Sequence, residues 1–136
     1  MLLFSMFVST LIFFAACSPG NNTTMNVSQA VSSGTWRITL FTNSGTDQTA
    51  NFAGYSFTFS SGGTITVVNG SITKNGTWSV NGSLNKFSID LGVKDNTNKP
   101  LGDLTNDWLI ISSNNTEVRL KDDSSTSNEL VTFTKN

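Results

Sequence analysis

Apolar and polar residues alternate along most of the chain from residue 34 onward. In the first run, residues 35–42, Trp36, Ile38 and Leu40 fall on one face and Arg37 and Thr39 on the other. This period of two is the pattern of a β-strand with one buried face. Seven similar runs follow, at residues 55–60, 64–68, 72–80, 86–91, 107–113, 116–122 and 129–135. The pattern therefore predicts eight strands.

Short polar turns separate these runs and predict antiparallel neighbours. Asn-Gly pairs at 69–70 and 81–82 are strong hairpin signals. A third pair, Asn75-Gly76, falls inside a run and indicates a bulge or a second tight turn. Closing the sheet would remove its two exposed edges. We therefore predict an all-β, eight-stranded antiparallel up-and-down barrel, with a two-sheet β-sandwich as the alternative, because period-two patterning fits both.

Two connections are long enough to carry a function. Residues 92–106 form the longest, and within them Leu101 and Leu104 could be the apolar contacts of a single helical turn. Long connections in compact domains are often functional. This one is either a lid over the barrel mouth or a plug over the core, and the connection at residues 42–54 is the next candidate.

The N-terminus has a different character from the rest of the chain. Residues 1–16 carry no charge and are almost entirely apolar. The run is shorter than the roughly 20 residues of a membrane-spanning helix. It fits the apolar core of a secretory signal peptide, although the usual positively charged start is missing. An uncleaved membrane anchor and a soluble chain are the alternatives.

The run ends in "FAAC", which resembles the lipobox of bacterial lipoproteins, with Phe14 in place of the usual Leu. The resemblance implies that Cys17 becomes the lipid-bearing N-terminus after cleavage behind Ala16. We accordingly expect a signal peptide at 1–16, a lipidated Cys and flexible tether at 17–33, and a barrel domain at 34–136. Ser18, rather than Asp, implies a lipid-anchored protein of the outer membrane that faces the periplasm.

The barrel region also resembles a known family. Gly34-Thr35-Trp36 is similar to the Gly-x-Trp signature that opens the first strand of lipocalins, where the Trp closes one end of the barrel. "FAGYSFTFSSGGTITVVNG", "LTNDWLIISSNNTEVRLKD" and "LVTFTKN" extend the likeness to small lipocalin-like bacterial lipoproteins. The resemblance implies a barrel and an apolar cavity. A basic residue packs across this Trp in lipocalins, and Lys135 and Arg119 are the candidates here.

Composition removes several classes of function. The chain has 12% charged residues and a net charge of −1, so we expect no nucleic-acid partner. It has no His and one Cys, which excludes a Ser-His-Asp triad and His-ligated metals. We expect no enzyme, no metal and no cofactor. Four carboxylates surround the longest connection and are expected to serve in turns and caps rather than in a calcium site: Asp90, Asp95, Asp103 and Asp107.

The inward aromatic residues are the candidate ligand-binding site. They could line a pocket for a small apolar molecule or fill the barrel. Tyr55 offers a polar group, because a buried phenol needs a partner. The candidates are Trp36, Tyr55, Phe57, Phe59, Phe87 and Trp108, with Trp78 beside them. Two functions stay open: a monomeric binding module for a small apolar ligand, and an interaction protein with a solid barrel that contacts an envelope protein or glycan.

Overall fold

The computed structural model describes residues 23–136, with side chains from residue 27 onward. The described part contains the helix α1 (Thr23–Val31) and three single turns of 3-10 helix, η1 (Thr49–Phe52), η2 (Asn96–Asn98) and η3 (Leu101–Leu104). The strands are β1 (Trp36–Asn43), β2 (Thr46–Asp47), β3 (Ser56–Phe59), β4 (Thr64–Asn69), β5 (Ile72–Asn81), β6 (Lys86–Asp90), β7 (Asn106–Ser113), β8 (Glu117–Asp122) and β9 (Leu130–Lys135).

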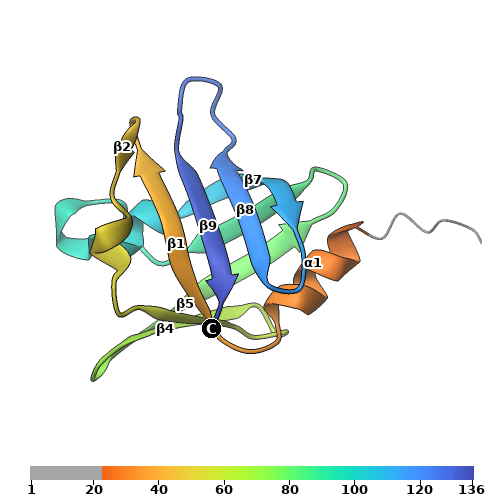
Figure 1. Cartoon of the computed structure of the whole chain (residues 1–136), viewed down its shortest axis with the longest axis horizontal. Helices are drawn as coiled ribbons and strands as arrows, with labels where there is room; N and C mark the ends of the chain where they lie inside the picture. The colour runs from red at the N-terminus through yellow and green to blue at the C-terminus, as the bar shows by residue number, and fades with distance from the viewer. Residues whose placement is uncertain (1–22) are drawn as a thin grey trace, which may run out of the picture.

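The strands form a closed antiparallel barrel (Figure 1). From β3 to β9 each strand pairs with the next in sequence, and β1 pairs with both β3 and β9. The β1–β9 ladder runs from Trp36↔Lys135 to Thr42↔Leu130 and closes the ring. β2 is an extra strand that pairs only with the end of β1. The predicted eight-stranded barrel is confirmed, and the alternative of a β-sandwich is wrong because the first and last strands pair along their length.

One part of the barrel wall is not a strand ladder. β1 and β3 share a single residue pair, Trp36↔Phe57. Beyond it the connection at residues 42–54 supplies the partners of β1: Thr49 Oγ1 accepts from the Phe41 N–H, and Phe41 O accepts from Gln48. Phe52 in η1 is buried there against the Phe41 ring, 5.0 Å between centroids. This connection is therefore part of the wall.

Two local details of the strands differ from expectation. A bulge between Ile38 and Leu40 shifts the phase of β1, so Phe41 is buried and Leu40 is only half-buried. The expected inward position of Leu40 is wrong, because alternation restarts after the bulge. The pair Asn75-Gly76 makes neither a bulge nor a turn, since the β4–β5 register is continuous across it. Gly76 fits there because a Cβ would clash with Asp90 O on β6.

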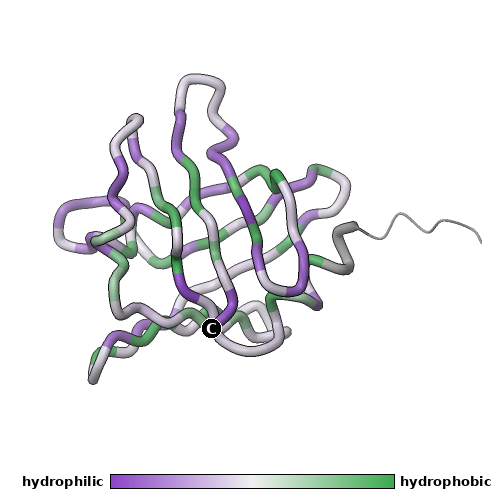
Figure 2. Tube along the Cα trace, in the orientation of Figure 1, coloured by the Kyte–Doolittle hydropathy of each residue, from purple (hydrophilic) through white to green (hydrophobic). Residues whose placement is uncertain are grey.

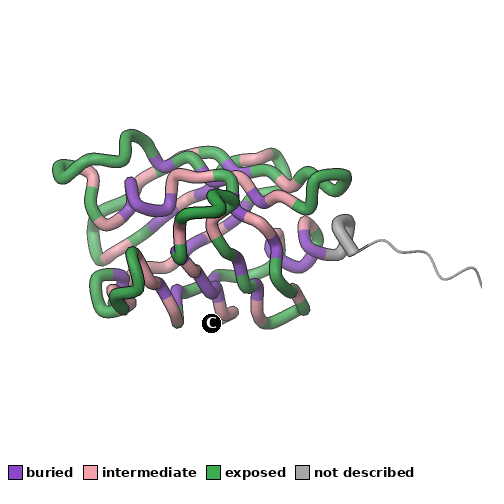
Figure 3. Tube along the Cα trace, turned by 90° about the horizontal axis from the view of Figure 1, so that it is seen from above, coloured by how far each residue is buried: buried purple, intermediate pink, exposed green. Residues whose placement is uncertain are grey.

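The barrel interior is packed with aromatic and branched side chains. Figure 2 shows apolar and polar positions alternating along the strands, and Figure 3 shows buried positions along the strands and exposed positions gathered in the loops. Phe59 lies at the centre of this core: its ring centroid is 5.5 Å from Trp78, 5.6 Å from Phe87 and 5.4 Å from Phe133. Edge-to-face contacts of this kind are the favoured geometry of aromatic pairs.

The segment expected to be a tether is in part a helix. α1 covers Thr23–Val31, and Val27, Ala30 and Val31 are buried against the barrel. Their spacing places all three on one helical face. The expected tether is therefore wrong for this stretch, and the packed domain begins before residue 34. The signal peptide at 1–16, Cys17 and the rest of the expected tether up to residue 22 lie outside the described residues.

Trp36 closes the end of the barrel that α1 covers. Its side chain is fully buried, and its indole N–H donates to Val31 O at 3.0 Å. Lys135 Nζ lies 5.0 Å from the ring centroid and donates to Ser33 Oγ at 2.9 Å. Of the two basic candidates, Lys135 is the one that covers Trp36, whereas Arg119 is exposed on β8. We call this the α1 end.

Residues 91–105 cover the opposite end, which we call the loop end. Leu101 and Leu104 in η3 are buried in the core, as expected for the helical turn. The Trp108 indole N–H donates to Leu104 O at 3.0 Å. The Asn98 amide donates to Leu91 O and Val93 O at 3.1 and 2.8 Å. In this structure the segment is a packed plug rather than an open lid.

Candidate functional site

The aromatic residues proposed from the sequence as a ligand site lie in the core. Trp36, Phe57, Phe59, Phe87 and Trp108 are each at most 1% exposed. Tyr55 is half-buried beside the β1–β3 seam, with ring centroids 6.2 Å from Phe52 and 6.5 Å from Phe57. The structure thus brings five of the six into the interior, where they contact other side chains. Their role in binding a ligand stays a prediction.

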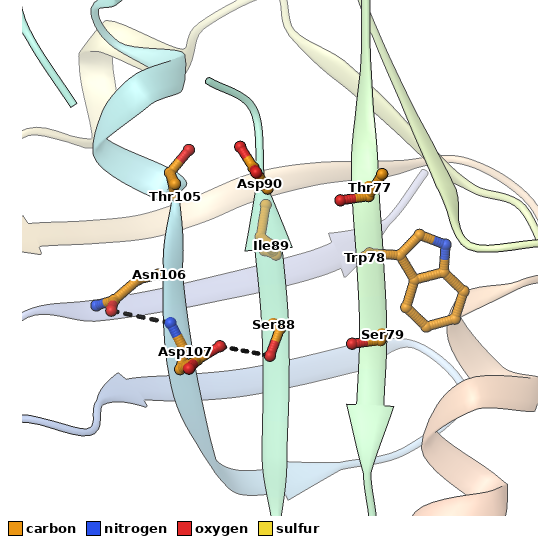
Figure 4. Close-up of a pocket in the computed structure, with 9 residues that line it drawn as sticks. All are labelled: Thr77, Trp78, Ser79, Ser88, Ile89, Asp90, Thr105, Asn106 and Asp107. Carbon is orange, nitrogen blue, oxygen red and sulfur yellow. Dashed lines mark hydrogen bonds between the residues drawn. The ribbon is translucent and has the colours of Figure 1, made fainter. Parts of the chain in front are cut away.

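A concavity of a different kind lies on the outer wall of the barrel, across β5, β6 and β7. It has a volume of about 430 Å³ and is open to solvent. Figure 4 shows its side chains in two rows across the three strands, one of Thr105, Asp90 and Thr77 and one of Asp107, Ser88 and Ser79. We call this surface the outer groove; Trp78, Ile89 and Asn106 complete its lining.

The strand register explains these rows. Thr77 pairs with Asp90, and Ser88 pairs with both Ser79 and Asp107. Residues opposite each other in a sheet point to the same face. Because Trp78 and Ile89 point into the core, their neighbours in the strands must point outward. The groove is therefore the polar side of the same alternation that builds the core.

Hydrogen bonds hold several groove side chains in place. Ser88 Oγ donates to Asp107 Oδ1 at 2.5 Å, and Asp90 Oδ1 accepts from the Gly92 N–H at 2.9 Å. Thr105 Oγ1 accepts from the Leu91 N–H at 2.9 Å and donates to Gly92 O at 2.8 Å. Each carboxylate keeps lone pairs beyond these contacts. The groove can therefore accept hydrogen bonds from a ligand in fixed directions.

A second concavity extends the groove along β5 and β6. It has a volume of about 230 Å³, shares Thr77 and Asp90 with the first, and is lined also by Lys74 and Gly92. Lys74 adds an ammonium donor, which is already bonded to Asn98 Oδ1. The combined surface holds carboxylates, hydroxyls, the amides of Asn75 and Asn106, and one cation. Its polar groups can form hydrogen bonds with a ligand that carries hydroxyl groups.

The carboxylates that the sequence brought together have separate roles. Asp90 and Asp107 lie in the outer groove, whereas Asp103 is buried in η3. Asp95 caps η2 by accepting from the Thr97 and Asn98 N–H groups. The pKa of Asp95 lies below its ordinary value, mainly because the Thr97 hydroxyl donates to the carboxylate and also because these N–H groups do. Within residues 23–136, no three His, Cys, Asp or Glu side chains are placed to hold a metal ion.

Nothing in the residue pattern marked the outer groove in advance. Thr77, Ser79 and Ser88 are ordinary outward residues, and polar outward residues also occur outside the groove, such as Thr66 on β4 and Ser112 on β7. The groove depends on how β5, β6 and β7 curve, which alternation does not encode. No helix in the described part of the chain has the length and apolar character to cross a membrane.

Comparison with known proteins supports the fold. No family model and no curated protein matches the chain. Among solved structures, it is similar to the crystal structure, at 1.00 Å resolution, of a DUF4847 family protein from Bacteroides vulgatus ATCC 8482. The TM-score is 0.61 at 18% sequence identity, and the match covers 81% of this chain and 97% of that one. At this identity the likeness shows a shared fold.

Proposed function

We propose that this protein is a lipid-anchored protein of the cell envelope that binds a polar partner on the outer wall of its barrel. The observation that carries the proposal is the filled core: Phe59 contacts the rings of Trp78, Phe87 and Phe133 at the centre of the barrel. An apolar ligand at that place would have to displace one of these rings. A buried aromatic side chain covers about 150–250 Å², so exposing one costs about 4–6 kcal/mol.

The chemistry of the outer groove favours a glycan or another hydroxyl-rich molecule. The carboxylates of Asp90 and Asp107 accept hydrogen bonds from hydroxyl groups, and the hydroxyls of Thr77 and Ser79 can donate or accept. These residues stand on neighbouring strands rather than on a loop, so the binding geometry is preformed. We propose binding without catalysis, by a monomer that uses no cofactor.

The anchor in this proposal is a lipid on Cys17. It rests on the apolar run at 1–16, the small residues before Cys17 and the fact that this is the only Cys of the chain. Cys17→Ser should abolish incorporation of labelled fatty acid and release the protein from membranes. Unchanged labelling of this variant would refute the anchor and leave the binding proposal to be judged by itself.

Binding can be tested with the detergent-solubilised full chain. We expect envelope glycan fragments to shift the NMR amide signals of β5, β6 and β7, and free fatty acids to leave the core signals unchanged. Ser79→Trp should fill the groove and remove the glycan shifts. Ser112→Trp, the same change at an exposed position of β7 outside the groove, should keep them. Shifts of Phe59 and Phe87 on addition of fatty acid would instead support an apolar ligand inside the barrel.

A further inference from the structure

The second half of α1 is fixed to the barrel. Val27 and Val31 are each 1% exposed, and Val31 O accepts from the Trp36 indole. Ser32 continues the helical bonding by donating its N–H to Ser28 O at 3.1 Å. Figure 1 shows α1 at one extreme of the long axis of the molecule and residues 91–105, coloured teal, at the other. The chain therefore enters the domain at a defined end.

Two of the large exposed apolar side chains lie at this α1 end. Leu84, in the β5–β6 turn, is 58% exposed, and Ile111 on β7 is 49% exposed. Asn85 joins the turn that carries Leu84 to β7. Its side-chain amide donates to Ile110 O at 2.9 Å, and its backbone O accepts from the Ile110 N–H at 3.0 Å. α1 lies beside the end of β7, because Gln29 and Ala30 line the same concavity as residues 113–115.

The length of chain between the anchor and the helix limits where this end can lie. Five residues lie between Cys17 and Thr23 at the start of α1. The two are therefore six steps apart along the chain, and each step spans at most about 3.6 Å when extended. A lipid on Cys17 would therefore keep the start of α1 within about 20 Å of the bilayer. Exposed apolar side chains at the same end of the barrel would gain free energy by entering the acyl boundary, in addition to the anchor itself.

We propose that the α1 end is the membrane-contacting face of the protein, with Leu84 and Ile111 inserted among lipids and the loop end directed away from the bilayer. This inference rests on the proposed lipid anchor at Cys17. It also predicts which exposed apolar side chains reach lipid, which exposure alone does not. Val93 is 67% exposed, more than either Leu84 or Ile111, yet it belongs to the loop end and should not reach lipid.

The test uses the full chain, purified from membranes and reconstituted into vesicles of phosphatidylethanolamine and phosphatidylglycerol. A cysteine introduced as Leu84→Cys, Ile111→Cys or Val93→Cys carries an environment-sensitive fluorophore, while the lipid occupies the thiol of Cys17. Nitroxide groups on the acyl chains then quench any fluorophore that reaches them. We expect roughly two-fold quenching or more at positions 84 and 111, and emission at position 93 unchanged.

Flotation of the same samples separates the two proposals. Vesicle flotation that is lost in Cys17→Ser reports the anchor alone. Floating protein with quenching at position 93 equal to that at 84, or with no quenching at 84 and 111, overturns the membrane-contacting face and leaves the anchor standing. An absence of quenching at positions 84 and 111 would mean that Leu84 and Ile111 contact something other than lipid. Protein that fails to float overturns the anchor, and the orientation with it.

Discussion

The two ends of the barrel are closed in the same way but differ in the hydrogen bonds that hold the covering segment. At each end a fully buried Trp near the start of a strand donates its indole N–H to a carbonyl of the preceding helical segment. Trp36 donates to Val31 O and Trp108 to Leu104 O, both at 3.0 Å. Both covering segments bury apolar side chains, Val27 and Val31 at the α1 end and Leu101 and Leu104 at the loop end. The difference is that side-chain hydrogen bonds also hold the backbone of the covering segment at the loop end.

The α1 end can rely on apolar contact because a helix satisfies its own backbone groups. Val27, Ala30 and Val31 supply the buried face, and Lys135 covers the Trp36 ring. The loop end has only short turns of helix, so its buried N–H and C=O groups need other partners. Thr105 and Asn98 provide them for the N–H and C=O groups of Leu91, and Asp95 accepts from the exposed Thr97 N–H. Substitutions should therefore act through lost bonds at the loop end and through lost burial at the α1 end.

The largest effect should come from a substitution that forces the loop end apart. A Cβ on Gly102 would clash with Val93 O and lie 2.9 Å from Asn98 Nδ2. Gly102→Ala should lower the free energy of unfolding by about 3 kcal/mol, measured by urea denaturation. Gly62→Ala is the control, because a Cβ at that position would meet no atom within 4 Å. Equal stability of the two variants would contradict the close contact at Gly102.

Removing the Asn98 side chain should loosen the loop end without moving the α1 end. Asn98→Ala leaves Leu91 O and Val93 O without their donor and takes away the acceptor of Lys74. We expect a loss of about 2 kcal/mol in unfolding free energy. Hydrogen exchange should become faster in residues 91–105 and stay unchanged in α1. The exposed Asn115→Ala serves as the control, and uniform acceleration across the chain would argue against separately held ends.

The corresponding change at the α1 end should act through burial. Val27→Ala removes two methyl groups from a side chain that is 1% exposed and should cost about 1.5 kcal/mol of unfolding free energy. The exchange of α1 amides should accelerate while residues 91–105 keep their protection. Gln29→Ala is the control, at an exposed residue of the same helix. A loss of protection at both ends would show that the closures are coupled.

The smallest effect should be a response to acid that only the loop end shows. The Thr97 hydroxyl lowers the pKa of Asp95 in the folded protein, below an unfolded value of about 3.9. This stabilisation is present above the unfolded pKa and is lost as the pH falls through the folded pKa. The Thr97 and Asn98 amide signals should therefore move on acidification below about pH 4, and Asp95→Asn should remove that response. The stretch 27–36 contains no carboxylate, so its signals should stay in place.

Much of the barrel was predictable because strand alternation is a local signal. Phe57 and Phe59 on β3, and Ile65 and Val67 on β4, are buried as the two-residue period predicts. Weaker local signals led to errors. α1 shows only three apolar residues at helical spacing in a polar segment, and the bulge that buries Phe41 in place of Leu40 leaves no mark in the alternation.

The candidate sites were less predictable than the strands. The inward direction of Trp36, Phe57 and Phe87 followed from the pattern, but whether they surround a space or fill it depends on the combined volume of side chains from the whole ring. The outer groove was missed because Ser79 in the groove and Ser112 outside it look alike in sequence. Only the curvature and register of neighbouring strands separate them.

The amino-acid sequence by itself determined the eight strands of the ring, most of their inward faces and the position of Trp36 at the start of the barrel, because each depends on residues close together in the chain. The tertiary structure decided three further points: that β1 meets β9 and closes the ring, that Lys135 rather than Arg119 covers Trp36, and that aromatic rings meet at the barrel centre. These depend on contacts between residues far apart in the sequence, such as Trp36 and Lys135. Such contacts are set by how the whole chain packs rather than by any local period.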